Sequence, residues 1–233
     1  MSARWHGLLT PLLLMAIVVP PGLSAARLST SWATAVPVRA QDPEGIVRRA
    51  DQALAALRTL RAEFVQEVHN PLLERTTTGR GRLLYKSPDR FRIAYSDPAG
   101  DLVVHDGAHV WIYLPSTQPG QVIRQDAEVS GVRNPLTYLR DLRGRFTARE
   151  AGVEPIAGRA ADKLVLAPRT ADAGFDEIVA WVDRASGLLR RVRTTTEDGV
   201  VTTYTFTSLE RNVELGDGPF RFTPPRGIEV FDQ

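Results

Sequence analysis

The stretch Gly79–Pro115, GRGRLLYKSPDRFRIAYSDPAGDLVVHDGAHVWIYLP, decides the fold. Apolar residues recur in it at every second position, which is the period of a β-strand with one buried face. Turn-forming residues interrupt the alternation at Ser87-Pro88-Asp89, at Asp97-Pro98-Ala99-Gly100 and at Asp106-Gly107. The pattern predicts four consecutive antiparallel strands, the last two joined as a tight hairpin at Asp106-Gly107.

The strand pattern continues on both sides of this stretch. Phe64, Gln66 and Val68 predict a strand that begins near Ala62. Further strands are expected, in chain order, over Gln121–Gln125, Arg145–Glu150, Ala160–Ala167, Glu177–Asp183, Leu188–Thr196 and Val200–Leu209.

Two segments have helical rather than strand periodicity. Asp42-Pro43-Glu44 forms a helix start, and apolar residues follow at helical spacing from Ile46 to Leu60. Asn134-Pro135 opens a second, short helix within Gly131–Leu142. The expected fold is therefore mainly β with two or three helices. About 10–11 strands in one antiparallel sheet must curl into an incomplete, half-open barrel, whose hollow side the helices cover as a lid.

The N-terminus carries an export signal. Leu8–Val19 is an apolar run that follows Arg4 and precedes Pro20-Pro21-Gly22, and it is too short to span a bilayer of roughly 30 Å. We expect residues 1–40 to be a signal peptide, cleaved after Ala25, Ala35 or Ala40, and residues 41–233 to form a single domain. An uncleaved membrane anchor is the alternative.

Composition narrows the class of protein further. The chain contains no cysteine, so an exported protein of this sequence has neither disulfides nor a lipid-modified cysteine. Arg4, Arg27 and Arg39 lie within the expected signal, and without them acidic and basic residues nearly balance. A nucleic-acid-binding domain would be strongly basic, so no nucleic acid is expected as a partner.

The sequence lacks the common motifs of catalysis and cofactor binding. Gly79-Arg80-Gly81 lies inside a strand pattern, where it indicates a bend in the sheet rather than a phosphate-binding loop. His105 and His109 flank a hairpin turn, but two ligands make a poor metal site, and we interpret them as solvated histidines. His69 is interpreted as a loop residue. We expect no enzyme activity, no metal and no cofactor.

Large apolar residues are more abundant than a plain sheet core requires, although an ordinary barrel core remains the alternative for each one. A barrel of eight strands is just filled by its own side chains, and a barrel of more strands leaves room for a ligand. The expected lining of a hydrophobic cavity is Phe64, Leu83, Tyr85, Phe91, Ile93, Tyr95, Ile112 and Trp181. The expected lid residues are Leu54, Leu57, Leu136 and Leu139.

Several short motifs occur together in an order typical of one family. Phe64-x-Gln66 follows the first helix, and Gly79-x-Gly81-x-Leu83 precedes Ser87-Pro88-Asp89-Arg90-Phe91-Arg92. Asp106-Gly107 is followed by Trp111-Ile112-Tyr113, and the chain closes with Phe220-Arg221-Phe222-Thr223-Pro224-Pro225-Arg226-Gly227. From Glu44 to Val230 the chain resembles the LolA family of periplasmic carriers of outer-membrane lipoproteins.

The resemblance implies a half-open β-barrel with a helical lid over a hydrophobic cavity, without catalysis or cofactor. It implies a monomeric periplasmic carrier that receives acylated lipoproteins from an inner-membrane ABC transporter and delivers them to an outer-membrane acceptor. One position departs from the family. Ser87 stands where the family commonly has an arginine that tethers the lid, and Arg90 or Lys86 is the expected substitute.

Two alternatives stay open at this point. The first is a related half-barrel that binds another lipid or senses mislocalised lipoproteins, although such sensors usually have a second domain. The second is a lipid-modifying hydrolase that uses scattered carboxylates.

Overall fold

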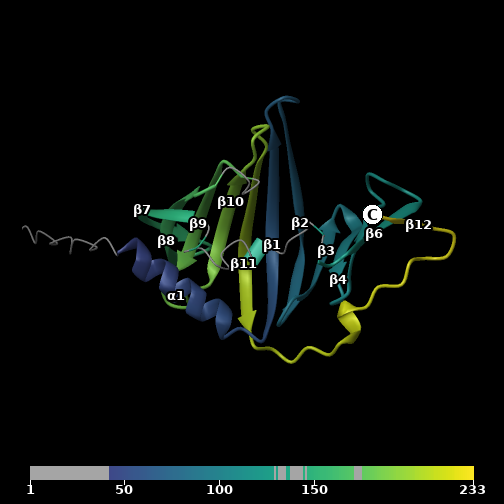
Figure 1. Ribbon diagram of the computed structural model, residues 1–233, viewed down its shortest axis with the longest axis horizontal. Helices are drawn as coiled ribbons and strands as arrows, with labels where there is room; N and C mark the ends of the chain where they lie inside the picture. Colours follow the sequence, from purple (N-terminus) through teal and green to yellow (C-terminus); the bar gives the residue numbers. More distant parts are fainter. Residues whose placement is uncertain (1–41, 129, 131–134, 137–143, 145, 171–174) are drawn as a thin grey trace, which may run out of the picture. The chain divides into compact units, whose positions relative to one another are not determined.

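Within the described part of the chain, the fold consists of one large β-sheet with one long helix against it (Figure 1). The computed structural model describes residues 42–128, 130, 135–136, 144, 146–170 and 175–233, all of which belong to one unit of the chain, Arg39–Gln233. The expected signal peptide and Leu139 lie outside the described residues. Among the described helices, none is long and apolar enough to cross a membrane.

The described residues form a sheet of twelve strands, in the order β12-β6-β5-β4-β3-β2-β1-β11-β10-β9-β8-β7. The strands are β1 Thr59–Asn70, β2 Arg75–Lys86, β3 Arg90–Asp97, β4 Ala99–His105, β5 His109–Tyr113, β6 Gln121–Asp126, β7 Phe146–Ile156, β8 Arg159–Pro168, β9 Glu177–Asp183, β10 Leu189–Thr195, β11 Val201–Arg211 and β12 Glu229–Asp232.

This topology confirms the predicted class, a mainly β fold on an open antiparallel sheet. Two series of hairpin-connected strands, β1–β6 and β7–β11, meet where β1 pairs with β11. Strands β12 and β7 form the two edges, so the sheet does not close into a barrel. The unexpected twelfth strand is β12, which pairs parallel to β6 after a long connection. Four residues beside two prolines carry too little alternation to predict a strand.

The first helix is shorter than predicted. Helix α1 spans Pro43–Ala55, and the Asp42 carboxylate accepts a hydrogen bond from the Glu44 N–H (3.3 Å) at its start. The apolar residues after Ala55 also fit the strand period, because Leu60, Ala62 and Phe64 of β1 are buried on one face. Because β1 pairs with β2 from Thr59 onward, these residues form a strand and do not continue the helix. The second helix predicted within Gly131–Leu142 lies largely outside the described residues.

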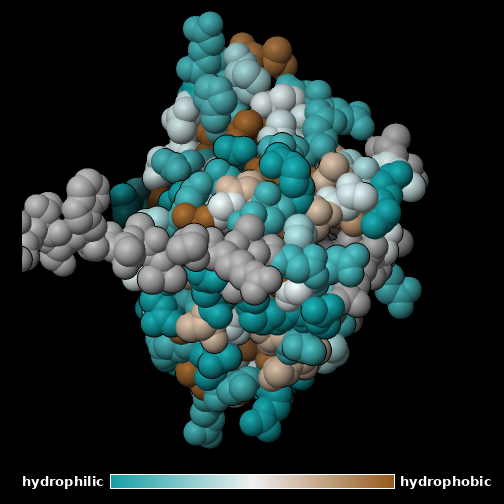
Figure 2. Space-filling view, turned by 90° about the vertical axis from the view of Figure 1, so that its left-hand side faces the viewer, coloured by the Kyte–Doolittle hydropathy of each residue, from teal (hydrophilic) through white to brown (hydrophobic). Residues whose placement is uncertain are grey.

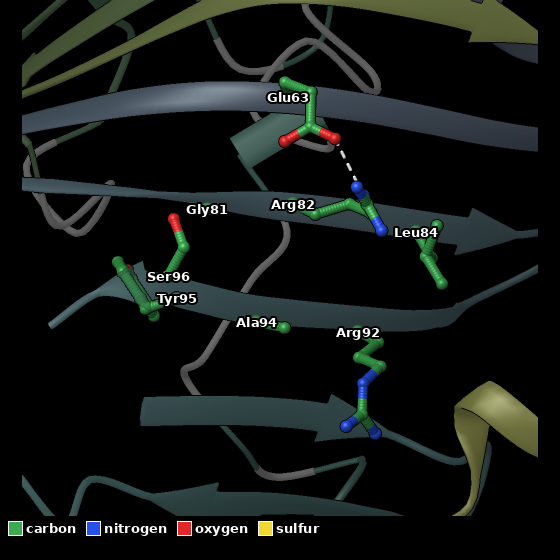
Figure 3. Close-up of a pocket in the computed structure, with 8 residues that line it drawn as sticks. All are labelled: Glu63, Gly81, Arg82, Leu84, Arg92, Ala94, Tyr95 and Ser96. Carbon is green, nitrogen blue, oxygen red and sulfur yellow. Dashed lines mark hydrogen bonds and ion pairs between the residues drawn. The ribbon is translucent and has the colours of Figure 1, made fainter. Parts of the chain in front are cut away.

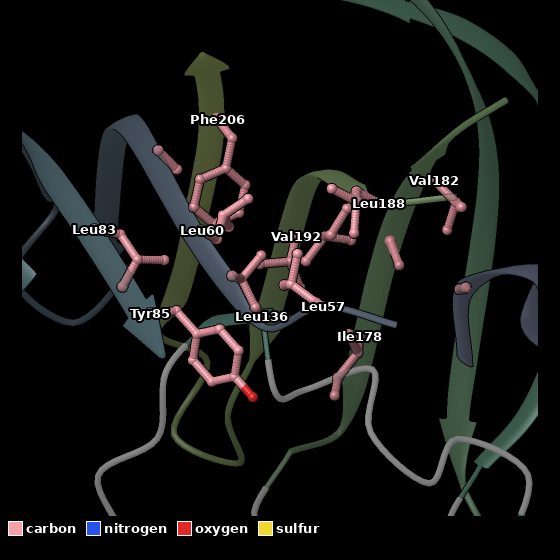
Figure 4. Packing of buried hydrophobic residues seen from close by; sticks show 14 of the residues in the cluster. Leu57, Leu60, Leu83, Tyr85, Leu136, Ile178, Val182, Leu188, Val192 and Phe206 are labelled. Atoms are coloured by element: carbon pink, nitrogen blue, oxygen red, sulfur yellow. The ribbon is translucent and has the colours of Figure 1, made fainter. Parts of the chain in front are cut away.

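The face of the sheet that α1 covers, called here the helix face, carries the main core (Figure 4). Register places the residues of this face in rows that cross several strands: Ala62, Leu83, Ile93, Val103 and Ile112 form one such row. The buried residues of the cluster are Ile46, Val47, Ala50, Leu57, Leu60, Ala62, Phe64, Leu83, Tyr85, Phe91, Ile93, Leu136, Phe146, Leu164, Leu166, Ile178, Ala180, Val182, Leu188, Leu189, Val192 and Phe206.

The opposite, outer face is covered in part by the segment that follows β11. In this segment the 3-10 helix η3, Gly218–Phe220, places Phe220 in a buried position. Phe222 lies against Trp111 and Tyr113, with ring centroids 5.6 and 6.1 Å apart. The Arg92 guanidinium donates to the Pro219 carbonyl (3.2 Å).

Helix α1 is fixed to the sheet by a buried carboxylate as well as by apolar contacts. Asp162 of β8 is only 1% exposed and forms ion pairs with Arg49 of α1 and with Arg184. Next to this pair, a Cβ at Gly187 would lie 2.9 Å from the Arg49 carbonyl oxygen, so the turn between β9 and β10 approaches the helix backbone closely. Since Gly187 also has a φ of +71°, glycine suits both the turn and the contact.

The same turn depends on Asp183, whose carboxylate accepts hydrogen bonds from the Ala185 and Ser186 N–H groups (3.0 and 2.7 Å). Arg190 and Arg159 also donate to it. Burial by itself would raise the pKa of Asp183, but the Ser186 N–H and the two guanidinium groups outweigh burial and lower this pKa from 3.8 to about 2.

This lowered pKa predicts a specific acid sensitivity. The Asp183 carboxylate stabilises the fold fully above its unfolded pKa of 3.8, and its contribution, about 2 kcal/mol, is lost as the pH falls from about 4 towards 2. Urea unfolding at several pH values should show wild type more stable than Asp183→Asn at pH 7, with the difference shrinking below pH 4. A difference that stays constant down to pH 2 would contradict this role of the carboxylate.

Candidate functional site

The helix face brings together most of the residues predicted to line a cavity. Strands β1, β2 and β3 supply Phe64, Leu83, Tyr85, Phe91 and Ile93, each no more than 5% exposed. Tyr95 packs against the same cluster and is partly exposed. These residues stand on adjacent strands and form one continuous apolar surface.

Three of the predicted lid residues lie against that surface. Leu57 and Leu136 are buried in the cluster, at 3% and 2% exposure, and Leu54 of α1 packs against it. Figure 4 shows Leu57 and Leu136 among Leu60, Tyr85 and Val192. Leu57 belongs to the connection after α1 rather than to the helix itself.

Two predicted lining residues lie outside the buried cluster of the helix face. Trp181 packs on the outer face with Ile156, Ala161 and Val179, and its indole N–H donates to Glu154 (2.8 Å). Sequence alternation failed here because β9 is buried on both faces, so its apolar run does not reveal which residues face the helix. Ile112 does lie on the helix face, in the row of Ile93, but it is partly exposed and outside the buried cluster.

The predicted tether is also placed differently. Arg90 pairs with Asp217 (3.0 Å), as does Lys86 (2.6 Å), so both side chains hold the segment after β11 and not the helix. The Arg49–Asp162 pair holds α1 instead. Sequence reasoning missed this pair because its members are 113 residues apart. The available signal was the lone acidic Asp162 beside a run of apolar residues in β8.

Next to the apolar cluster stands a group of hydrogen-bonded polar side chains. The sequence analysis did not identify this group. The Phe64 ring lies between Tyr95 and Tyr204, with ring centroids 5.4 and 5.7 Å away. The Gln66 amide joins the two hydroxyls, because it donates to Tyr204 (2.8 Å) and accepts from Tyr95 (2.7 Å). Burial raises the pKa of Tyr95, which keeps this hydroxyl a donor. The three side chains link β3, β1 and β11 across the helix face.

Gly81 makes room for this arrangement. It lies opposite Phe64 on β1 and Tyr95 on β3. A Cβ at Gly81 would stand 2.4 Å from the Ala94 carbonyl oxygen and 2.9 Å from the Phe64 ring. The close approach of strands and ring explains why glycine stands here, beside the register shift between β2 and β3 at Arg80/Gly81. The bend expected at Gly79-Arg80-Gly81 stays a prediction.

Substitution of the two glycines should therefore have unequal effects. Gly81→Ala should lower the free energy of unfolding by about 3 kcal/mol or more, because the Ala94 backbone cannot move aside cheaply. Gly79→Ala should cost about 1 kcal/mol at most, since its Cβ would meet the Tyr95 ring at 3.1 Å. Urea denaturation of both variants measures the difference, and equal losses would refute the steric explanation.

A hollow of about 320 Å³ lies by contrast among mostly polar residues of β1, β2 and β3 (Figure 3). Its lining consists of Glu63, Gly81, Arg82, Leu84, Arg92, Ala94, Tyr95 and Ser96. Arg82 pairs with Glu63 at 2.7 Å, and burial lowers the pKa of Arg92. This charged hollow does not suit an apolar ligand, so the apolar helix face is the better candidate site.

The two histidines considered as metal ligands, His105 and His109, lie on opposite faces of the sheet. His105 lies in the row of Tyr85 and Phe91 and is only 9% exposed, so its interpretation as a solvated histidine was wrong; the Gly107 N–H donates to its ring (3.2 Å). His69, interpreted as a loop residue, lies in β1 and pairs with Thr76 of β2. His109 lies on the other side of the hairpin strand, beside Trp111. The two rings thus point to opposite faces and do not converge. No group of three or more potential metal ligands occurs among the described residues.

Comparison with known proteins identifies the family. The family model "Outer membrane lipoprotein carrier protein LolA" matches residues 55–223. A curated outer-membrane lipoprotein carrier protein of Haemophilus influenzae is 30% identical over 77% of this chain and 83% of its own. The protein of the same name from Dechloromonas aromatica is 30% identical over 80% of this chain and 87% of its own.

Solved structures share the fold at lower identity. An uncharacterised conserved protein of Thermus thermophilus has a TM-score of 0.53 and 16% identity, over 83% of this chain and all of that one. MucB in the Pseudomonas aeruginosa MucA/MucB complex structure has a TM-score of 0.52 and 20% identity, over 78% of this chain and 62% of that longer one. Because the family model spans most of the described sheet, the chain belongs to the LolA family of outer-membrane lipoprotein carrier proteins.

Proposed function

We propose that this protein binds the acyl chains of lipoproteins on the helix face of its sheet and carries them through the periplasm to the outer membrane. The observation that carries the proposal is the continuous apolar surface of β1, β2 and β3 on an open sheet, with the predicted lid residues Leu57 and Leu136 in the same buried cluster. Family membership and the names of the relatives support the identity of the cargo.

The hydrophobic effect favours transfer of acyl chains from water to the apolar helix face. Each acyl CH₂ group kept from water contributes about 0.8 kcal/mol, so the chains of a lipoprotein cannot cross water uncovered. The apolar residues that would receive them, Leu83 and Ile93 among them, belong to the same buried cluster as the predicted lid residues Leu57 and Leu136. Cargo that takes the place of these cover residues exchanges one apolar contact for another. Binding and release then follow relative affinity and require no energy source.

The cover is held in a way that allows movement. Helix α1 buries only three apolar side chains, Ile46, Val47 and Ala50, and adds the Arg49–Asp162 ion pair. An opening that separates this pair also admits water to both charges, which offsets much of the lost attraction. Asp162 keeps its second partner, Arg184. The ion pair therefore restrains the helix without fixing it permanently.

The finer assignments follow the family. The protein acts as a monomer without catalysis, receives cargo from an inner-membrane ABC transporter and passes it to an outer-membrane acceptor. In this account the Tyr95–Gln66–Tyr204 group marks the polar end of the apolar surface, where the peptide part of the cargo would begin.

Substitution of two neighbouring leucines on opposite faces of β2 tests whether the helix face binds acyl chains. Leu83→Glu places a carboxylate on the helix face, whereas Leu84→Glu places one on the outer face, where Leu84 is already partly exposed. The first variant should lose most of its capture of a triacylated lipoprotein, because a buried charge opposes apolar binding. The second should capture cargo as wild type does.

Capture is measured by pulling down a co-expressed lipoprotein from the periplasm, with a non-acylated form of that lipoprotein as the background. Thermal melting of each variant ensures that capture is compared below its melting temperature, since Leu83→Glu also lowers stability. Full capture by folded Leu83→Glu, or equal capture of the non-acylated form by wild type, would refute the proposal.

A further inference from the structure

The β1–β2 hairpin extends past its neighbour on one side. Strands β1 and β2 pair along their whole length, from Thr59 with Lys86 to Asn70 with Arg75. Strand β3 pairs with β2 only from Arg80 onward. The turn and the first residues of β2 therefore stand beyond β3, and Figure 1 shows the hairpin reaching past the ends of the neighbouring strands.

The tip of this hairpin exposes two leucines. Leu72 is 79% exposed and Leu73 is 70% exposed, whereas the next most exposed large hydrophobic among the described residues, Phe231, is 40% exposed. In Figure 2 hydrophobic atoms appear at the upper end of the molecule, the end at which the hairpin projects in Figure 1. Two adjacent leucines with so little cover lower solubility and contribute nothing to the core.

The turn that presents them is ordered by its own contacts. The Leu73 N–H donates to the Asn70 side chain (3.1 Å), and the Glu74 N–H donates to the Pro71 carbonyl (3.3 Å). Pro71 packs against Gly199 in the turn between β10 and β11, where an added Cβ would meet it at 3.2 Å. A formed turn presents both side chains without a further entropic cost of ordering on binding.

We propose that the hairpin tip is a membrane-contact site, which inserts Leu72 and Leu73 into the interfacial region of a phospholipid bilayer. Two side chains on one turn cover far less than the roughly 800 Å² per partner of a specific protein interface. They suit a shallow insertion of about 5–10 Å at the boundary of headgroups and acyl chains. The polar residues behind them, Asn70, Arg75 and Thr76–Thr78, lie where headgroups would surround the stem.

The chemistry of the tip predicts a weak and reversible contact. Glu74 and Arg75 place opposite charges side by side, so attraction to anionic lipids is small and the apolar contact dominates. One myristoyl chain binds membranes with an association constant of only about 10⁴ M⁻¹, and two leucines contain less apolar surface than that. The site goes beyond the proposed function, since it binds lipid surface without cargo and gives a carrier a brief contact with a membrane.

A local probe tests this site directly, because the chain contains no cysteine that would compete for the label. The full chain with Arg75→Cys, labelled with the polarity-sensitive dye NBD, is titrated with vesicles of phosphatidylethanolamine and phosphatidylglycerol. The NBD emission should rise and shift to the blue. Adding Leu72→Asn and Leu73→Asn should raise the lipid concentration at half-response by about tenfold or more.

Two controls match the design. The dye at Thr117→Cys, exposed in the loop between β5 and β6, should not respond, and Val153→Asn, which removes an exposed hydrophobic from β7, should leave the Arg75→Cys response unchanged. No response at the tip, or an equal response after both leucines are replaced, would overturn the proposal. If the leucine variants lost cargo delivery but the NBD label at the tip gave no response to vesicles, the tip would bind a protein partner and the proposal would also be overturned. Because the assay contains no cargo, its result is independent of acyl binding on the helix face.

Discussion

Pairing of β1 with both β2 and β11 is the constraint on which the rest of the structure depends. It joins the two strand series, β1–β6 and β7–β11, into one sheet. Leu60 of β1 lies opposite Tyr85 of β2 on one side and opposite Arg211 of β11 on the other. The register shift between Glu63 and Phe64 in the β1–β11 pair brings Phe64 level with Phe206. From this central strand the apolar surface extends in both directions, and helix α1 lies against the part of the sheet that contains β8 and the β9–β10 turn.

The elements set by local chemistry were predictable from the sequence. The Asp106-Gly107 hairpin and the alternating faces of β2 and β3 follow from turn residues and period alone. Five of the predicted lining residues consequently lie in the buried cluster of the helix face. Each of these features depends on residues close together along the chain, where sequence patterns are informative.

The features below were predicted wrongly or missed because contacts between residues far apart along the chain determine them. Trp181 was assigned to the wrong face because β9 is buried on both sides, and the end of α1 was placed too late because Leu57 and Leu60 fit two periods. The Arg49–Asp162 pair and the parallel strand β12 join segments that are far apart along the chain. No local pattern specifies such partners, so the means by which the helix is held became visible only in the structure.

The two covering segments are held by separate charges. Asp162 holds α1 over the helix face, while Lys86 and Arg90 hold the segment after β11 through Asp217 on the other side. Because Lys86 and Arg90 pair with Asp217, release of the helix need not disturb the C-terminal segment. This separation gives a mechanical basis for a cover that moves while the sheet and its outer face stay intact.

The distance between α1 and the sheet tests this account most directly. Spin labels at Gln52→Cys on α1 and Glu67→Cys on β1, both exposed positions in a chain without other cysteines, report that distance by pulsed electron paramagnetic resonance. Addition of a triacylated lipopeptide should lengthen the distance, and the same peptide without acyl chains should not. An unchanged distance with the acylated peptide bound would contradict displacement of the helix by cargo.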